Sequence, residues 1–199
     1  MKNIKIAVTG GIGSGKTSVC EIIKNLGFPV FSCDEVYSEL LRDEAFVCAV
    51  SELVGVLTAK KDGHTVIDRR AVSQKIFSNG ELKKKLDNFT HPLIMKTLLS
   101  KMSAVGSGPV FAEVPLLFEG GFENLFDKIV VVIRPLESRI AAVEARSGMS
   151  RQEVLSRIKN QFDYEKISET AHTLICNDSD FEELKKKVSA ALRDIVKES

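Results

Sequence analysis

The sequence predicts an α/β protein built on a parallel β-sheet that is covered by helices on both faces. Two observations carry this prediction: short apolar runs alternate with segments of helical periodicity, and a glycine-rich turn follows the first apolar run directly. Strands that alternate with helices form parallel sheets, because each helix carries the chain back across the sheet. The predicted strands cover residues 4–9, 28–31, 110–114, 129–133 and 173–176.

The predicted helices begin and end at residues that favour helix termini. A helix over residues 16–26 precedes Gly27, and a later helix stops at Gly148, because glycine readily adopts the left-handed backbone of helix C-termini. Ser150 and Glu153 have capping-box spacing at the start of the next helix. The last helix presents one apolar face, formed by Phe181, Leu184, Val188, Leu192 and Ile195.

One stretch, residues 35–105, breaks the alternation. Its periodicity is mostly helical, it holds one polar turn at residues 60–64, and it contains no strong strand pattern. We therefore expect a single domain whose core is formed by residues 1–34 and 106–199. Residues 35–105 are expected to form a helical insertion near the carboxyl ends of the strands.

The composition is that of an ordinary globular protein of 199 residues. The formal net charge is only +1, from 28 basic and 27 acidic residues, so no global field marks a nucleic-acid or membrane binder. Four cysteines without a CxxC pair and only three histidines argue against a structural zinc site. Without a signal-like opening segment, we expect a cytoplasmic protein with reduced thiols, and nothing indicates an obligate protein partner.

The glycine-rich turn, residues 10–17, reads GGIGSGKT and fits the pattern GxxxxGK[ST]. Glycines let backbone N–H groups approach a phosphate, and the helix that begins near Lys16 adds the positive end of its dipole. Lys16 supplies a mobile positive charge to the β- and γ-phosphates, and Thr17 supplies a hydroxyl for Mg²⁺. The residues predicted to bind ATP are Gly11, Ile12, Gly13, Ser14, Gly15, Lys16 and Thr17.

Other proteins that use such a turn fit this sequence less well. A GTPase would carry an NKxD pattern after a later strand, but residues 177–180 read NDSD and no NKxD occurs. A DNA-stimulated ATPase would be expected to carry more basic charge. The turn therefore favours a kinase.

Transfer to a hydroxyl also needs a carboxylate near the acceptor, which orients the hydroxyl, takes its proton or holds the metal. Asp34 follows the second strand and lies beside the turn if the first two strands are sheet neighbours. It equally suits the N-cap of a helix that begins near Val36. Glu113 ends an apolar run, where P-loop enzymes hold a metal-water ligand, although a surface acid would look the same; Glu119 is a weaker candidate.

Arginines that could stabilise the transferring phosphoryl group cluster after the strand at residues 129–133. Arg139 and Arg146 share a helix face, and one or two members of the cluster are expected to reach phosphate. The lysine runs at residues 83–85 and 185–187 are interpreted as solvated helix faces. The cluster consists of Arg134, Arg139, Arg146, Arg151 and Arg157.

The chain resembles the dephospho-coenzyme A kinase family from end to end. The opening IAVTGGIGSGKTSVCEIIKNLGFPV is followed by VIDRRAVSQKIFSN at residues 66–79, THPLIMK at 90–96 and EVPLLFE at 113–119. The DRR, HPLI and PLLFE runs in this order are the specific part, because many P-loop kinases share the turn. The match ends with Arg139, Arg146, Gly148, Gln161 and Asn177.

This resemblance implies a P-loop NTPase fold: a five-stranded parallel sheet flanked by helices, a helical substrate-binding insertion and a small lid over about residues 139–170. It implies transfer of a phosphoryl group from ATP, with Mg²⁺, to the ribose 3′-hydroxyl of dephospho-CoA, the last step of coenzyme A biosynthesis. The implied catalytic residues are Asp34, Lys16 and Arg139. The further ATP-binding residues are Arg146 and Asn177. The implied acceptor-binding residues are Asp34, Arg69, His91, Pro115 and Leu116. The metal is assigned to Thr17 and Glu113.

The sequence departs from the family in two places. The usual DADxxAR pattern after the second strand reads SCDEVYS, so that the first acid is replaced by Ser32 and the arginine by Ser38, while Asp34 remains. Near the C-terminus, AD-x-VI-x-N appears as AHTLICN, with His172 in place of the acid. Because Asp34 remains, we expect the activity to be retained, and these positions are where rate or acceptor preference would differ.

Two other functions stay open on the sequence. One is a nucleoside or nucleotide kinase of the same architecture, and the other is a nucleotide-binding switch protein with slow hydrolysis. Asp34 and the helical insertion favour the kinase that acts on dephospho-CoA.

Overall fold

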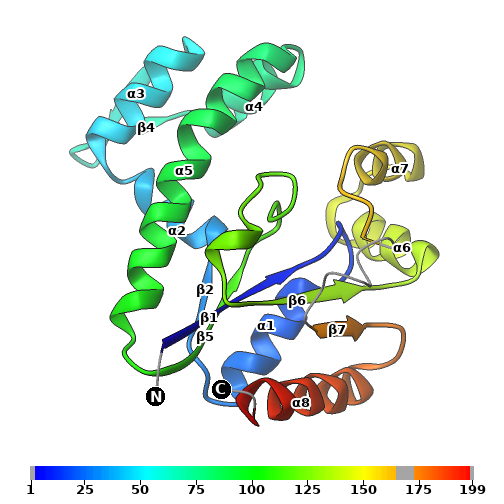
Figure 1. The fold of residues 1–199 in the computed structure, drawn as a ribbon. Helices are drawn as coiled ribbons and strands as arrows, with labels where there is room; N and C mark the ends of the chain where they lie inside the picture. Colours follow the sequence, from blue (N-terminus) through cyan, green and yellow to red (C-terminus); the bar gives the residue numbers. More distant parts are fainter. Residues whose placement is uncertain (1–2, 165–172, 198–199) are drawn as a thin grey trace. The chain divides into compact units, whose positions relative to one another are not determined.

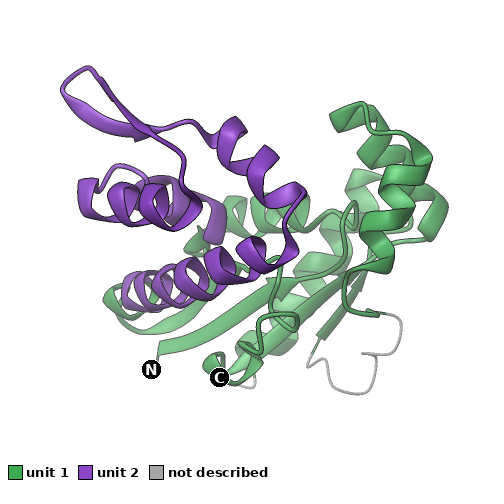
Figure 2. Ribbon diagram, turned by 90° about the horizontal axis from the view of Figure 1, so that it is seen from above, with its two compact units in different colours: residues 1–31, 102–199 green, residues 32–101 purple. Residues whose placement is uncertain are grey.

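The computed structural model describes residues 3–164 and 173–197. The chain divides into two units, which are coloured separately in Figure 2. One unit comprises Met1–Phe31 and Met102–Ser199, and the other comprises Ser32–Lys101.

The first unit is organised around a five-stranded parallel sheet with the strand order β2-β5-β1-β6-β7 (Figure 1). The central strand is β1, in which Val8 lies opposite Glu113 of β5 on one side and opposite Val130 of β6 on the other. The predicted strands of the sheet are thus confirmed, with small shifts at their ends. The strands are β1 (Asn3–Thr9), β2 (Val30–Ser32), β5 (Gly108–Glu113), β6 (Lys128–Ile133) and β7 (Thr173–Cys176).

Two helices, α1 (Lys16–Asn25) and α8 (Phe181–Lys197), pack against the sheet and against each other. Their buried faces join the strand side chains Ile6 and Phe111 in one core. Phe181 is 53% exposed, so the apolar face of α8 begins at Leu184, one turn later than predicted. This core fixes the carboxyl ends of β1 and β5 beside the start of α1.

A second, smaller core joins α6 (Leu136–Ser147) and α7 (Arg151–Lys159) to the turn after β1. Gly148 ends α6 in the left-handed conformation, and the capping box at the start of α7 is confirmed. The side chain of Ile12 packs against this core, so the glycine-rich turn is anchored to both helices. The buried members of the core are Ile140, Val143 and Val154.

The predicted lid, residues 139–170, overlaps both of these helices. Its residues 165–170, like His172 in the departing C-terminal motif, lie outside the described residues.

The second unit is built mainly from helices and has its own core. Phe46 of this core stacks on Phe89 with ring centres 5.9 Å apart. The helices are α2 (Cys33–Leu40), α3 (Glu44–Val54), α4 (Arg69–Phe77) and most of α5 (Gly80–Ala104). The buried core residues are Phe46, Val50, Val54, Val72 and Leu86.

The expectation that this stretch contains no strand was wrong, because β3 (Thr58–Lys61) and β4 (His64–Ile67) form an antiparallel hairpin. Every residue of β3 is exposed, so the strand has no burial pattern that the sequence could display. Asp62 and Gly63 form the turn with φ angles of 52° and 79°. An Asp-Gly pair with positive φ at both residues is the favoured two-residue hairpin turn.

The long helix α5 continues through Pro92. His91, which the resemblance places on the acceptor side, lies within this helix. No helix in the described part of the chain combines the length and apolar character needed to cross a bilayer.

Candidate active site

The turn at residues 10–17 joins the end of β1 to the start of α1, as predicted. Gly15 caps α1 with a left-handed backbone (φ 94°), and a Cβ there would collide with the side-chain nitrogen of Asn177. A Cβ at Gly11 would collide with the guanidinium of Arg139, so glycine is needed for these close approaches. The first N–H groups of α1 have no intrahelical acceptor, which is the arrangement that binds phosphate at helix N-termini.

Lys16 lies over this turn. Its ammonium donates to the carbonyl oxygens of the turn's first two glycines at 2.8 and 3.1 Å. Burial lowers the pKa of Lys16; the nearby Glu113 opposes this shift, whereas the charges of Arg139 and Arg146 add to it. A desolvated ammonium among like charges gains strongly from an added anion, so this arrangement favours phosphate.

Thr17 and Glu113 form the second polar pair of the turn. Thr17 Oγ1 donates to Glu113 Oε1 at 3.0 Å, because β5, which ends in Glu113, is paired with β1. Hydroxyl and carboxylate oxygens suit Mg²⁺, which keeps several waters and takes further ligands from substrate phosphates. The residues that the structure describes hold no cluster of three or more His, Cys, Asp or Glu side chains that could bind a metal.

One of the five clustered arginines bonds to the turn: Arg139 Nε donates to the Ile12 carbonyl at 3.0 Å. The charge of Arg146 contributes to the lowered pKa of Lys16. Arg151 instead makes a two-pronged contact with the carboxylate of Glu137, at 2.8 and 2.7 Å. That contact lowers the pKa of Glu137 and holds α7 to α6.

Asn177 follows β7 and lies against the turn. Its side chain is buried, and Nδ2 donates to the Ser14 carbonyl at 2.9 Å. Its backbone N–H donates to the Ile133 carbonyl at 2.8 Å, which extends the β6–β7 ladder by one residue. The last strand of the sheet thereby holds the turn through one amide.

Two further residues contact this region although sequence reasoning assigned them no role. Gln161 Oε1 accepts from the Ile12 N–H at 2.8 Å; the family pattern that includes Gln161 was the available signal.

Tyr164 is buried, its hydroxyl lies 3.4 Å from each of three oxygen atoms, and burial raises its pKa to about 12. No local sequence pattern predicts the role of Tyr164, because its contacts join distant parts of the chain. The three oxygens belong to Thr9, Pro115 and Glu119.

Pro115 and Leu116 lie in the loop that leads from β5 to the short 3-10 helix η1 (Glu123–Leu125). This loop is tied to the segment after α7, because Glu119 Oε1 accepts from the Phe162 N–H at 3.0 Å. Glu119, the weaker acidic candidate, therefore holds the loop in place.

The other predicted acceptor residues, Asp34, Arg69 and His91, all lie in the second unit. The exposed Asp34 carboxylate has no hydrogen bond or ion pair with any other described residue. The Arg69 guanidinium lies 5.6 Å from the centre of the Tyr37 ring, a cation–π distance. His91 Nε2 lies 3.7 Å from Asp87 Oδ1, one turn earlier on α5.

Asp34 differs from both sequence-based predictions of its place. The strands β1 and β2 are not neighbours, because β5 lies between them, and the acid next to the turn in the sheet is Glu113. Nor is Asp34 an N-cap, since α2 begins at Cys33 and the Ser32 hydroxyl accepts from the Asp34 N–H at 3.2 Å. Ser38 Oγ donates to the Asp34 carbonyl at 2.8 Å, so both departing serines bond to the backbone around Asp34.

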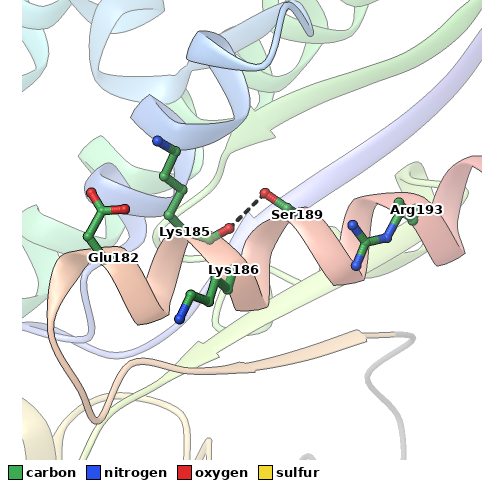
Figure 3. Close-up of a pocket in the computed structure, with 5 residues that line it drawn as sticks. All are labelled: Glu182, Lys185, Lys186, Ser189 and Arg193. Carbon is green, nitrogen blue, oxygen red and sulfur yellow. Dashed lines mark hydrogen bonds between the residues drawn. The ribbon is translucent and has the colours of Figure 1, made fainter.

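A hollow on the surface of α8 is lined by residues outside the candidate active site (Figure 3). Two of the lining residues are bonded to each other, since Ser189 Oγ donates to the Lys185 carbonyl at 2.8 Å. None of its lining residues belongs to the predicted site. They are Glu182, Lys185, Lys186, Ser189 and Arg193, all on one helix.

The glycine turn between a buried strand and a helix, its lysine, and a threonine paired with an acid on the adjacent strand define a P-loop nucleotide-binding protein. Comparison with known proteins narrows this class.

A family model described as dephospho-CoA kinase matches residues 4–183. A dephospho-CoA kinase of Thermus thermophilus is 33% identical over 192 residues, which cover 96% of this chain and 92% of the relative. A crystal structure of a Thermus thermophilus protein superposes with a TM-score of 0.81 at 33% identity, covering 98% of this chain and 99% of that one. The structure of a dephospho-CoA kinase from Campylobacter jejuni gives 0.69 at 28% identity, with 98% of both chains covered. The chain belongs to the dephospho-CoA kinase family, which confirms the resemblance seen in the sequence.

Proposed function

We propose that this protein transfers the terminal phosphoryl group of ATP to the ribose 3′-hydroxyl of dephospho-CoA, giving ADP and CoA in the last step of coenzyme A biosynthesis. The observation that carries the proposal is the convergence of Lys16, Thr17 and Glu113 on the glycine turn, in a chain of this family. Such a turn serves phosphoryl transfer by positioning and charge stabilisation rather than by covalent chemistry.

On the nucleotide side, the backbone of residues 10–17 holds the β-phosphate and Lys16 reaches the β- and γ-phosphates. Arg139 and Arg146 bring positive charge beside Lys16. That charge stabilises the negative charge that spreads over the transferring group in the transition state. Asn177 supports the turn through its bond to the Ser14 carbonyl.

Thr17 and Glu113 would hold Mg²⁺, the threonine through its hydroxyl and the glutamate directly or through a bound water. When bound, the ion supplies positive charge to the β- and γ-phosphate oxygens. Glu113 also counteracts the lowering of the pKa of Lys16 by burial, so it helps to keep that ammonium charged.

On the acceptor side, Asp34 orients the ribose hydroxyl and takes its proton. The absence of a partner for its carboxylate among the described residues supports this role, because the carboxylate can accept from a ligand. Arg69 and His91 offer donors to the anionic groups of dephospho-CoA, and Pro115 and Leu116 offer apolar surface.

We place this reaction in the cytoplasm. The state of the cysteines supports that location, because all of them are free thiols and burial raises the pKa of Cys20, which keeps that thiol unreactive. The free cysteines are Cys20, Cys33, Cys48 and Cys176.

The test is an ADP-release assay with ATP, Mg²⁺ and a panel of acceptors: dephospho-CoA, AMP, CMP, dCMP, gluconate and shikimate. We expect acceptor-dependent ADP release with dephospho-CoA and formation of CoA. Faster turnover of a nucleotide would support a nucleotide kinase instead. Tight ATP binding with no acceptor-dependent release would support a nucleotide-binding switch.

A further inference from the structure

The turn between β7 and α8 is held by a lysine from the middle of α8. Lys187 Nζ donates to the Cys176 carbonyl at 3.1 Å and to Asp178 Oδ1, and it lies 3.5 Å from Ser179 Oγ. Ser179 Oγ donates to the same Asp178 oxygen at 2.8 Å. The three partners flank Asn177 on both sides, so the ammonium fixes the backbone that carries this residue.

Asn177 connects this turn to the phosphate-binding turn. Its amide donates to the Ser14 carbonyl at 2.9 Å, and it fills the space that a Cβ at Gly15 would need. A shift in the backbone of residues 176–178 would therefore move a group that contacts the start of α1. Two hydrogen bonds therefore connect Lys187 to the phosphate-binding turn: the bond from Lys187 to the Cys176 carbonyl and the bond from Asn177 to the Ser14 carbonyl.

The pKa shifts of Lys187 and Asp178 agree with this geometry. The hydrogen bond from Lys187 lowers the pKa of Asp178 well below its ordinary range, and the same bond raises the pKa of Lys187. Both groups therefore stay charged around neutral pH. An exposed ion pair alone contributes little to stability, but here the ammonium is also bonded to a main-chain carbonyl.

Lys187 bonds to the β7–α8 turn, whereas the lysine before it does not. Lys186 pairs with Glu183 at 3.2 Å on α8 itself and lines the surface hollow of that helix (Figure 3). The interpretation of residues 185–187 as one solvated run therefore fails for Lys187. The two lysines carry equal charge on neighbouring positions, which makes Lys186 a matched control.

We propose that Lys187 is a positioning residue for the nucleotide: it holds the β7–α8 turn so that Asn177 keeps the phosphate-binding turn in its binding conformation. This inference rests on the proposed ATP-dependent function. It predicts a loss of nucleotide affinity without a matching loss of the chemical step, because the printed bonds of Lys187 run to the β7–α8 turn that carries Asn177.

The test compares Lys187→Met with Lys186→Met by calorimetric titration with Mg-ATP in the absence of acceptor. We expect Lys187→Met to weaken binding roughly three- to tenfold, the scale of one lost hydrogen bond in the turn, and Lys186→Met to bind like wild type. Lys187→Arg should recover most of the affinity. With saturating ATP, kcat of Lys187→Met should stay within about twofold of wild type while KM for ATP rises by the same factor as Kd.

A second arm separates this role from general stabilisation. In an Asn177→Ala background, Lys187→Met should cause no further loss of ATP affinity, because the lysine acts through the asparagine. Equal affinities of Lys187→Met and Lys186→Met, or full additivity with Asn177→Ala, would overturn the inference. Failure of wild type to bind Mg-ATP at all would overturn the proposed function instead, so the two failures are distinguishable.

Discussion

The two units of the molecule hold their candidate functional side chains in different ways. In the first unit, three such side chains at the glycine turn have a partner in the sheet or in the turn itself: Thr17 with Glu113, Arg139 with Ile12, and Asn177 with Ser14. In the second unit, the Asp34 carboxylate has no such bond among the described residues. The residues proposed to bind the nucleotide are therefore held in advance by the fold, whereas the carboxylate proposed to meet the acceptor has no such bond.

This difference suggests that the two units have different functions, which are to position charge in the first unit and to accept a proton in the second. Groups that only position charge benefit from being fixed before the substrate arrives. A general base must instead be able to accept a proton from the ligand, and a bond to a fixed protein donor would compete with that. Changes in the first unit should then alter nucleotide affinity, and changes in the second should spare it.

The largest expected effect comes from Lys16→Ala. Removal of the ammonium takes away positive charge at the phosphates, and turnover should fall roughly 10²–10³-fold, the scale of one lost transition-state donor. The protein should still fold, because among the described residues the side-chain hydrogen bonds of Lys16 run to two carbonyls of the turn. Lys24→Ala, at the exposed end of the same helix, is the control. Turnover of Lys16→Ala near that of Lys24→Ala would remove the turn from the mechanism.

A smaller effect is expected from Gln161→Met, which keeps the length of the side chain but cannot accept from the Ile12 N–H. Loss of this single hydrogen bond should weaken ATP binding about two- to tenfold, measured by titration calorimetry. Gln152→Met, on exposed α7, should bind ATP like wild type. Unchanged affinity in Gln161→Met would show that the turn does not need this support.

The smallest effect on nucleotide binding is expected from a change confined to the second unit. Asp68 caps α4 by accepting from the Arg70 and Ala71 N–H groups at 2.8 and 3.2 Å. Asp68→Ala should lower the free energy of unfolding by about 1 kcal/mol, with ATP affinity unchanged. The exposed Glu52→Ala should change stability by less than about 0.5 kcal/mol. A parallel loss of ATP affinity in Asp68→Ala would contradict the division between the units.

Local patterns predicted the parts of this site that depend on neighbouring residues. The strand, glycine turn and helix around Lys16 follow one another in sequence, as do Gly148 and the capping box after it. The order of strands does not follow from local patterns. Asp34 would have adjoined the turn only if β1 and β2 were neighbours, and β5 lies between them.

The contacts missed at the sequence level all join distant residues. Tyr164 reaches Thr9, and Lys187 reaches back to the Cys176 carbonyl from the middle of a helix; neither contact leaves a periodic signal. The hairpin was missed because β3 is exposed along its whole length. Its Asp62-Gly63 turn was the one usable signal.

Replacement of Asp34 by asparagine tests the difference between the two units most directly. Asp34→Asn keeps the shape of the side chain, and Ser32 remains as the cap of α2. The matched control is Glu35→Gln, which removes the same charge from the same first helical turn. Loss of that charge should lower the free energy of unfolding of each variant by about 0.3–1 kcal/mol. The measurement pairs Mg-ATP affinity with acceptor-dependent ADP release.

We expect Asp34→Asn to bind Mg-ATP as wild type does, while its rate with dephospho-CoA falls roughly a hundredfold or more, the scale of a lost general base. Glu35→Gln should keep both properties. If Asp34→Asn turns over dephospho-CoA within a few-fold of Glu35→Gln, Asp34 is not the base and the role proposed for it is wrong.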